Sequence, residues 1–322
     1  MAIGTVVDLE RYCAALRAAG LDAPWSRPGP LIEPKRTRVE PWLWRWTEIE
    51  PLLRQSADFL TPARGEGAER RILRLMNPGV PERTSGHTIS VAVQYLLPGE
   101  VAPAHRHSPN AIRFMLRGEG AYTTVEGEKC AMHRGDVVLT PAMTWHDHGN
   151  EGREPVIWLD ALDAPVVRYI ENLVMEPYPA DRQPIGGHAG RVIHYPWEVA
   201  WEALSRLAEH EGDPFDDVIM EYRDPMTGRS LLPTIGCYLQ LLRPGVRTRS
   251  HRQSSMAVYH VFEGAGATEI EGECYEWGPG DFFVVPPWAR HAHAARGERP
   301  AILFSLQDVP LLRALGQYRE ET

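Results

Sequence analysis

Apolar and polar residues alternate, or apolar residues run together in short stretches, through most of the chain beyond residue 71. Stretches of this kind, separated by Gly-rich turns, are typical of half-buried or fully buried β-strands. We expect the first strands over 89–97, 111–116, 121–125 and 136–140, and a second group from 233 to 306. The pattern therefore predicts a mainly β protein with two groups of strands.

Three segments carry apolar residues at helical spacing instead. In the first, 8–20, Asp8 can cap the start of a helix and Gly20 can end it. The second opens at Pro196, since proline is favoured in the first turn of a helix, and it lies between the two groups of strands. Its apolar positions are Trp197, Ala200, Trp201, Leu204 and Leu207, with Glu198, Glu202 and Arg206 facing outward. A last short helix is expected over 310–318.

Three tryptophans alternate with other residues just after a Pro-rich, basic stretch at 24–41. They are Trp42, Trp44 and Trp46. On a strand their indoles share one side, because successive side chains point to opposite faces. We favour a hydrophobic face that packs on the rest of the fold or on a neighbouring subunit over a ligand cage.

The second group of strands repeats the motif spacing of the first. Corresponding segments are 99–105 with 245–251, 135–141 with 280–286, and 146–148 with 291–293. Internal duplication of this kind indicates two domains of the same architecture in tandem. The expected division is an N-terminal helix and arm (1–70), a first domain (71–165), a linker with its helix (166–230), a second domain (231–310) and a tail (311–322).

Histidines in the first domain have the spacing of a metal site. His105 and His107 are one residue apart, so on a strand both point to the same face, and His146 can join them from a neighbouring strand. Imidazole suits divalent transition metals. In the second domain His251 is followed by Gln253 where the first has its second histidine, although His291 and His293 are retained. We therefore expect the C-terminal site to be metal-free or only weakly occupied.

A metal with three histidine ligands keeps about three coordination positions open, enough for a bidentate organic ligand and dioxygen. Zinc hydrolysis is the competing chemistry. Arg113 lies six residues beyond His107 and shares its strand face if the strand is unbroken, and its guanidinium suits a carboxylate. His148 follows His146 by two residues and can bond a phenolate from the same side. A structural salt bridge for Arg113 and a core position for His148 stay open as alternatives.

Composition agrees with an intracellular enzyme. A chain of 322 residues with 43% hydrophobic residues can build two cores. A net charge of −9 and a pI near 5.8 argue against nucleic acid or an anionic membrane as partner. The four cysteines, Cys13, Cys130, Cys237 and Cys274, have no Cys-x-x-Cys spacing. Without a signal-like or long apolar segment, we expect a cytoplasmic protein.

The segments 99–107 and 135–150 together resemble the two characteristic motifs of the cupin family. This resemblance implies two tandem cupin barrels, which are double-stranded β-helices of the jelly-roll type. Cupins usually place a Glu four or five positions after the second histidine, but here those positions are Ala111 and Ile112. The expected ligand set is therefore three neutral imidazoles without a carboxylate.

From about residue 40 to 310 the chain is similar to the gentisate 1,2-dioxygenase group, which includes salicylate-type and 1-hydroxy-2-naphthoate dioxygenases. The similar segments are 75–79, 96–107, 111–114, 118–120, 132–136, 140–141, 145–150, 158–163 and 233–236. The resemblance implies an Fe(II) enzyme that uses O2 to cleave the aromatic bond between the carboxyl-bearing and hydroxyl-bearing carbons. Because only the first domain keeps three histidines, we expect one iron per chain. Together with the tryptophans at 42, 44 and 46, the resemblance suggests a homo-oligomer, expected to be a tetramer with the N-terminal arm at an interface.

Site roles also follow from this resemblance. Iron ligands would be His105, His107 and His146, and pocket residues would be Gln94, Arg113, His148 and Asp160, with Arg113 and His148 in catalysis. Arg70 and Arg71 both fit a further pocket position, and Arg71 is the one named in the expected site.

Substrate choice depends on Ser90. The family commonly carries an aromatic residue four positions before the pocket glutamine, and Ser90 stands there in this chain. A smaller residue would enlarge or rehydrate that wall. Gentisate, 5-substituted salicylates (nitro, chloro, amino) and 1-hydroxy-2-naphthoate all remain open as substrates. A bicupin isomerase or a small-molecule binder is the alternative from another class, and Mn, Ni or Zn are alternatives to iron.

Overall fold

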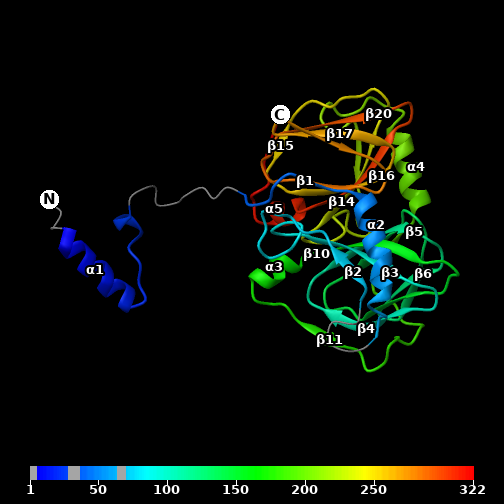
Figure 1. Ribbon diagram of the computed structural model, residues 1–322, viewed down its shortest axis with the longest axis horizontal. Helices are drawn as coiled ribbons and strands as arrows, with labels where there is room; N and C mark the ends of the chain where they lie inside the picture. Colours follow the sequence, from blue (N-terminus) through cyan, green and yellow to red (C-terminus); the bar gives the residue numbers. More distant parts are fainter. Residues whose placement is uncertain (1–5, 28–36, 64–69) are drawn as a thin grey trace. The chain divides into compact units, whose positions relative to one another are not determined.

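A computed structural model describes residues 6–27, 37–63 and 70–322. The chain forms two compact units, 1–37 and 38–322. The first unit contains α1 (Val6–Ala18) and a short 3-10 turn at Pro24–Ser26 (Figure 1). The predicted helix is confirmed, but it begins at Val6, so Asp8 lies in its first turn rather than at its cap. Gly20 follows the helix with a φ of +71°.

In its described residues, the N-terminal half of the second unit contains eleven strands, β2 to β12. They are β2 (Ile72–Arg74), β3 (Ser90–Leu96), β4 (Val101–His107), β5 (Ala111–Arg117), β6 (Ala121–Val125), β7 (Glu128–Met132), β8 (Val137–Thr140), β9 (His146–Asn150), β10 (Val156–Leu162), β11 (Met175–Pro177) and β12 (His194–Tyr195). A six-stranded sheet has the order β12-β8-β5-β10-β3-β2, and a five-stranded sheet has the order β11-β4-β9-β6-β7. The strands expected over 89–97, 111–116, 121–125 and 136–140 are confirmed within two residues at each end.

The C-terminal half repeats this plan. Its strands are β13 (Val218–Glu221), β14 (Gly236–Leu242), β15 (Arg252–Gln253), β16 (Ala257–Glu263), β17 (Ala265–Ile270), β18 (Glu273–Trp277), β19 (Phe282–Val285), β20 (His291–Arg296), β21 (Ala301–Gln307) and β22 (Glu320–Glu321), joined by β1 (Trp42–Trp44). A sheet of order β1-β19-β16-β21-β14-β13 matches the large sheet of the first half strand for strand, beside the smaller sheets β18-β17-β20 and β15-β22. The mainly β, duplicated fold is confirmed.

Over 38–63 and 70–322, four α-helices accompany these strands: α2 (Trp46–Gln55), α3 (Ala164–Tyr169), α4 (Trp197–Leu207) and α5 (Val309–Ala314), with a 3-10 turn at Ser56–Asp58 after α2. Of these, α4 and α5 were predicted, and Pro196 is the N-cap of α4. The sequence did not predict α2 or α3. In the described part of the chain, no helix is long and apolar enough to cross a membrane.

The two halves exchange edge strands. β1, from the segment before the first half, pairs with β19 of the second, and β12 pairs with β8 of the first. Each edge strand leads into a helix that begins with tryptophan and is capped by an aspartate from the sheet it joins. The Trp46 amide donates to Asp281 Oδ1 and the Trp197 amide to Asp136 Oδ1, both at 2.8 Å. β1 thus belongs to the sheet of the C-terminal half, whereas α2 runs back along β2 and β3 of the first half (Figure 1).

The tryptophan stripe is only partly a strand. The predicted alternation ends at Trp44, because Trp46 is the first residue of α2 and is buried. Trp44 donates its indole N–H to the Met76 carbonyl at 3.1 Å. Trp46 lies in the hydrophobic core and Trp44 packs against it, so packing against the fold is confirmed for these two, whereas Trp42 is exposed. The expectation of three indoles on one strand face is wrong.

Alternate residues of the large sheets face two different cores. One face of each sheet packs against the other half, where Phe114 and Phe304 stack at 4.0 Å between ring centroids. The opposite face lines the interior of its own half. In the first half this interior contains a small apolar cluster of Leu96, Met115, Ala121, Met132, Val138, Val156 and Trp158. Residues two positions from these along the strands therefore also point inward.

Candidate metal centre

His105 and His107 lie on β4 and His146 lies on the neighbouring strand β9, where His105 and His146 are register partners. Their ligand nitrogens all lie within 4.8 Å of one another. Ring centroids are 4.4 Å apart for His105 and His146, 4.7 Å for His107 and His146, and 5.5 Å for His105 and His107. The structure thus brings the three predicted ligands into one group that is able to bind a metal.

Each of these histidines uses one ring nitrogen for a hydrogen bond to the backbone, which leaves the other nitrogen for a metal. Nδ1 atoms of His105, His107 and His146 lie 2.8, 2.8 and 2.9 Å from the carbonyl oxygens of Pro103, Pro109 and Thr144. A carbonyl can only accept, so each Nδ1 carries the hydrogen and each Nε2 presents its lone pair. The Nε2 of His146 is buried without a hydrogen-bond partner.

Burial keeps these imidazoles neutral. It lowers the pKa of His105 to about 2 and that of His107 to about 4, and in both cases the Arg70 charge lowers the pKa further. Burial also holds the pKa of His146 well below its usual value. Neutral imidazole is the form that binds metal, so this donor set fits a divalent first-row transition metal at neutral pH.

Arg113, on β5, is held from two sides. Its Nε lies 3.0 Å from Asp160 Oδ1 on the adjacent strand β10, and Nη1 donates to Thr140 Oγ1 on β8. Asp160 Oδ2 accepts the indole N–H of Trp158 at 3.1 Å. The guanidinium is buried, and these contacts engage Nε and Nη1 but not Nη2. The salt bridge expected as an alternative is therefore present, and it orients Arg113 within the same interior.

His148 lies two residues beyond His146 on β9, with ring centroids 5.5 Å apart. Its Nδ1 is 2.9 Å from the hydroxyl oxygen of Thr123 on β6, the register partner of His148. Its Nε2 is fully buried without a hydrogen-bond partner, and burial holds its pKa well below the usual value. A neutral imidazole with one nitrogen anchored and the other available is suited to bind a ligand.

Gln94, on β3, is buried, and its Nε2 has no hydrogen-bond partner. Its Oε1 accepts from Arg70 Nη1 at 3.4 Å. Arg70 Nη2 lies 2.6 Å from His105 Nε2. Ser90 precedes Gln94 by four residues on the same inward face of the strand and is buried. Arg70 therefore joins the predicted pocket residues at the histidine group.

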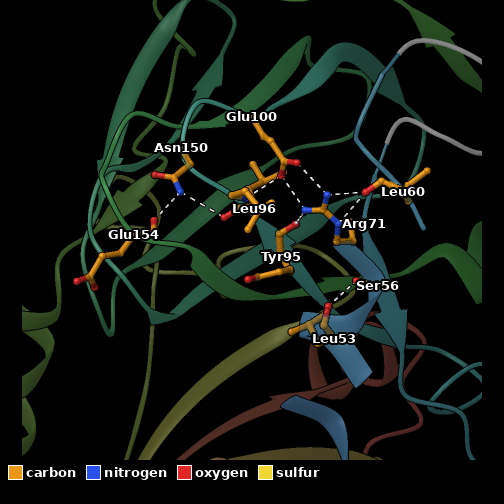
Figure 2. Close-up of polar contacts among 10 residues, drawn as sticks. Leu53, Ser56, Leu60, Arg71, Tyr95, Leu96, Glu100, Asn150 and Glu154 are labelled. Carbon is orange, nitrogen blue, oxygen red and sulfur yellow. Dashed lines mark hydrogen bonds and ion pairs between the residues drawn. The ribbon is translucent and has the colours of Figure 1, made fainter. Parts of the chain in front are cut away.

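Arg71 is located elsewhere, as Figure 2 shows. Its guanidinium makes a two-pronged ion pair with Glu100, at 2.7 and 2.8 Å, and also donates to the carbonyls of Leu60 and Tyr95. The expected site named Arg71, and the structure corrects this to Arg70. Consecutive residues of an extended chain point to opposite sides, so only one of the two arginines can reach the histidines.

Sequence reasoning did not name Thr123, Thr140 and Trp158, which hold His148 and Arg113 in place. Each lies on the inward face of a strand beside a named residue. A hydroxyl or indole at an inward position of a buried strand is the signal that could have identified them, since a buried polar group needs a partner.

The C-terminal half does not reproduce the three-histidine group. Gln253 turns its Oε1 to Ser255 Oγ at 3.0 Å and to the Tyr318 hydroxyl at 3.1 Å. Among the residues that the structure describes, His105, His107 and His146 are the one set of three or more His, Cys, Asp or Glu side chains with ligand atoms this close.

Comparisons with known proteins agree with this geometry. The cupin domain model matches residues 92–162 and 238–307. A 5-aminosalicylate 1,2-dioxygenase from Comamonas sp is 41% identical, over 98% of this chain and 90% of that protein, and a gentisate 1,2-dioxygenase from Aquipseudomonas alcaligenes is 34% identical, over 97% and 96%. A crystal structure of salicylate 1,2-dioxygenase from Pseudoaminobacter salicylatoxidans with gentisate superposes with a TM-score of 0.87 at 31% identity, covering 100% of this chain and 95% of that one. The chain therefore belongs to the gentisate and salicylate 1,2-dioxygenase family of ring-cleaving, cupin-fold enzymes.

Proposed function

We propose that this protein is an Fe(II)-dependent dioxygenase that opens the ring of a 2-hydroxybenzoate between its carboxyl-bearing and hydroxyl-bearing carbons. The observation that carries the proposal is the set of three neutral imidazoles that share one buried interior with His148, whose ring is 5.5 Å from that of His146, and with Arg113, whose charge acts on His146. When bound, Fe(II) would hold the substrate and O2 at about three open positions and relay electrons from ring to oxygen.

Arg113 would bind the substrate carboxylate. Asp160 and Thr140 hold Nε and Nη1 of its guanidinium, so Nη2 remains to contact the substrate. A side chain fixed in this way loses little freedom when the substrate binds, which favours affinity. Asp160 and Trp158 thus act on the substrate through Arg113.

His148 would hydrogen-bond the substrate hydroxyl through Nε2. Thr123 anchors Nδ1 of the same ring, so the imidazole cannot turn away when the substrate is absent. As a neutral base, His148 can accept the hydroxyl proton at Nε2.

Arg70 contacts the nitrogen of His105 that a metal would use, so metal binding there displaces its guanidinium. The charge of Arg70 would still add to that of Arg113 and favour an anionic substrate.

For the substrate we propose gentisate or a 5-substituted salicylate, with 1-hydroxy-2-naphthoate as the alternative. Ser90 and Ala92 both precede Gln94 on the inward face of β3, and these small side chains favour room for a ring substituent. The relative from Comamonas sp is a 5-aminosalicylate 1,2-dioxygenase. A bicupin isomerase or binder would not need Arg113 and His148 beside the metal ligands.

A panel of substrates tests this assignment. Protein reconstituted anaerobically with Fe(II) is given gentisate, 5-amino-, 5-nitro- and 5-chlorosalicylate, salicylate and 1-hydroxy-2-naphthoate, and ultraviolet spectra follow loss of the aromatic ring. We expect the highest kcat/KM with gentisate or a 5-substituted salicylate. A preference for hydroxynaphthoate would select the alternative, and no ring loss with any of them would contradict the proposal.

A further inference from the structure

Two histidines of the C-terminal half meet inside it. His251 and His291 correspond in the repeat to His105 and His146, and both are buried. They form an antiparallel bridge, and their Nε2 atoms are 3.1 Å apart.

The other nitrogen of each ring is already occupied by an acceptor. His291 Nδ1 is 3.1 Å from the Ala289 carbonyl oxygen, and His251 Nδ1 is 3.1 Å from the carboxylate oxygen Oε1 of Glu320. Both partners only accept, so both Nδ1 atoms carry hydrogen and both Nε2 atoms present lone pairs to each other. The two Nδ1 contacts and the Nε2–Nε2 contact each need one hydrogen, but two neutral imidazoles carry only two N–H groups between them. A shared proton or a metal ion between the two Nε2 atoms would satisfy this third contact.

The geometry distinguishes a metal ion from a shared proton. Imidazoles at right angles on a six-coordinate metal, with bonds of about 2.1 Å, have Nε2 atoms about 3.0 Å apart and ring centroids about 4.6 Å apart. A straight N–H···N bond of the observed length would place the centroids about 5.4 Å apart. The observed centroid distance is 4.5 Å. The lone pairs of the two Nε2 atoms thus point to a common position beside the line that joins these atoms. His105 and His146 are arranged in the same way, with their ring centroids 4.4 Å apart.

We propose that His251 and His291 bind a divalent transition-metal ion, with Glu320 as the carboxylate that orients His251. Glu320 lies on β22, the short C-terminal strand that pairs with β15 next to His251. A carboxylate behind a ligand histidine fixes the ring and strengthens its metal bond. Gln253 faces Ser255 and Tyr318, so water completes the coordination. With two imidazoles instead of three, this site is weaker than the N-terminal one and fills after it.

Cobalt binding to the full chain tests the proposal, since the absorption of Co²⁺ reports imidazole ligation. The protein is stripped with a chelator, and a His105→Ala/His107→Ala variant removes the N-terminal site. We expect this variant to bind one Co²⁺ per chain, and the addition of His291→Ala to abolish that binding. No binding up to millimolar Co²⁺ would overturn the proposal and assign the Nε2–Nε2 contact to a shared proton.

A milder pair of variants guards against misfolding. In the same background, Glu320→Gln is expected to weaken Co²⁺ binding roughly 10- to 100-fold, because it removes the charged partner of His251. Glu321→Gln is the matched control, since Glu321 lies on the same strand but pairs with Arg252. Equal Co²⁺ affinity in the two variants would overturn the role of Glu320 and, with it, the proposed site.

Discussion

Arg113 combines a structural contact and a proposed binding role in one side chain. Its Nε pairs with Asp160 inside the fold, and its Nη2 edge is the part proposed to bind the substrate. Removing it would leave two anions without their partner, the buried Asp160 in the free protein and the substrate carboxylate in the complex. Activity and stability therefore have to be measured separately for this residue.

We expect Arg113→Ala to lower kcat/KM at least 30-fold, since truncating a buried charge pair costs roughly 2–5 kcal/mol and about 1.4 kcal/mol is one decade. Iron should stay near one per chain. Arg113→Lys should recover only part of the activity, because an ammonium cannot make the two-pronged contact. Arg117→Ala is the matched control, as Arg117 lies on the same strand and is exposed. Parent-like turnover by Arg113→Ala would leave only its structural role.

Individual residues of the site show what the local sequence can and cannot predict. Spacing of two along β4 and β9 placed His105, His107 and His146 correctly, because strand geometry converts spacing directly into a shared face. Arg70 and Arg71 could not be separated, because they lie just before β2, where no pattern sets which residue faces inward.

At the level of elements, the least predictable feature is the exchange of β1 and β12 between the halves. β-strand pairing joins residues far apart in sequence, such as Trp44 and Phe282, and no local pattern reports the partner. α2 was missed because the alternating tryptophans read as a continuing strand and because Pro51 lies inside the helix. α4 was predicted because its apolar residues keep helical spacing after Pro196.

Docking of α2 depends on Gly280. Its φ is +90°, and a Cβ built there would lie 2.5 Å from the Trp46 ring. We expect Gly280→Ala to lower the free energy of unfolding by roughly 1–3 kcal/mol through overpacking and backbone strain. Gly278→Ala is the control, because a Cβ at Gly278 meets nothing within 4 Å. Denaturant unfolding of both variants is the measurement, and equal midpoints would contradict this docking.

For the whole molecule, two reciprocal hydrogen bonds join the halves. Thr88 Oγ1, just before β3 of the first half, donates to Asp308 Oδ2 of the second half at 2.7 Å, and Thr234 Oγ1, just before β14 of the second half, donates to Asp163 Oδ2 of the first half at 2.5 Å. Duplication predicted two similar halves. Duplication did not predict that β1, which precedes the first half, would pair with the second half, or that β12, which precedes the second half, would pair with the first. The spacing of the repeated motifs is the same whether or not these strands are exchanged.

Asp308 should make stability depend on pH. Burial raises its pKa to about 6, from an ordinary value of 3.8. The folded protein therefore binds this proton more tightly than the unfolded chain, and the contribution of Asp308 to stability falls as pH rises from about 4 through 6. We expect Asp308→Asn, compared with the parent, to gain about 2–3 kcal/mol in unfolding free energy between pH 4 and pH 8. A difference that does not change with pH would contradict the raised pKa.

A homotetramer remains our prediction for assembly. The segment 169–175 supports it, because Tyr169, Ile170, Leu173, Val174 and Met175 expose large apolar side chains, and clustered surface apolar residues mark interfaces. Light scattering should give about four times the chain mass of 36.3 kDa. A single species near 36 kDa would contradict it.

The most direct test of ring cleavage at the three-histidine centre is O2 consumption by the Fe(II)-loaded protein. With its best substrate, the parent should consume one O2 for each ring opened, without added reductant. A His146→Ala variant, shown by circular dichroism to be folded, should lose its N-terminal iron and its O2 uptake together. Ring cleavage without O2 consumption, or full activity in His146→Ala, would contradict the account.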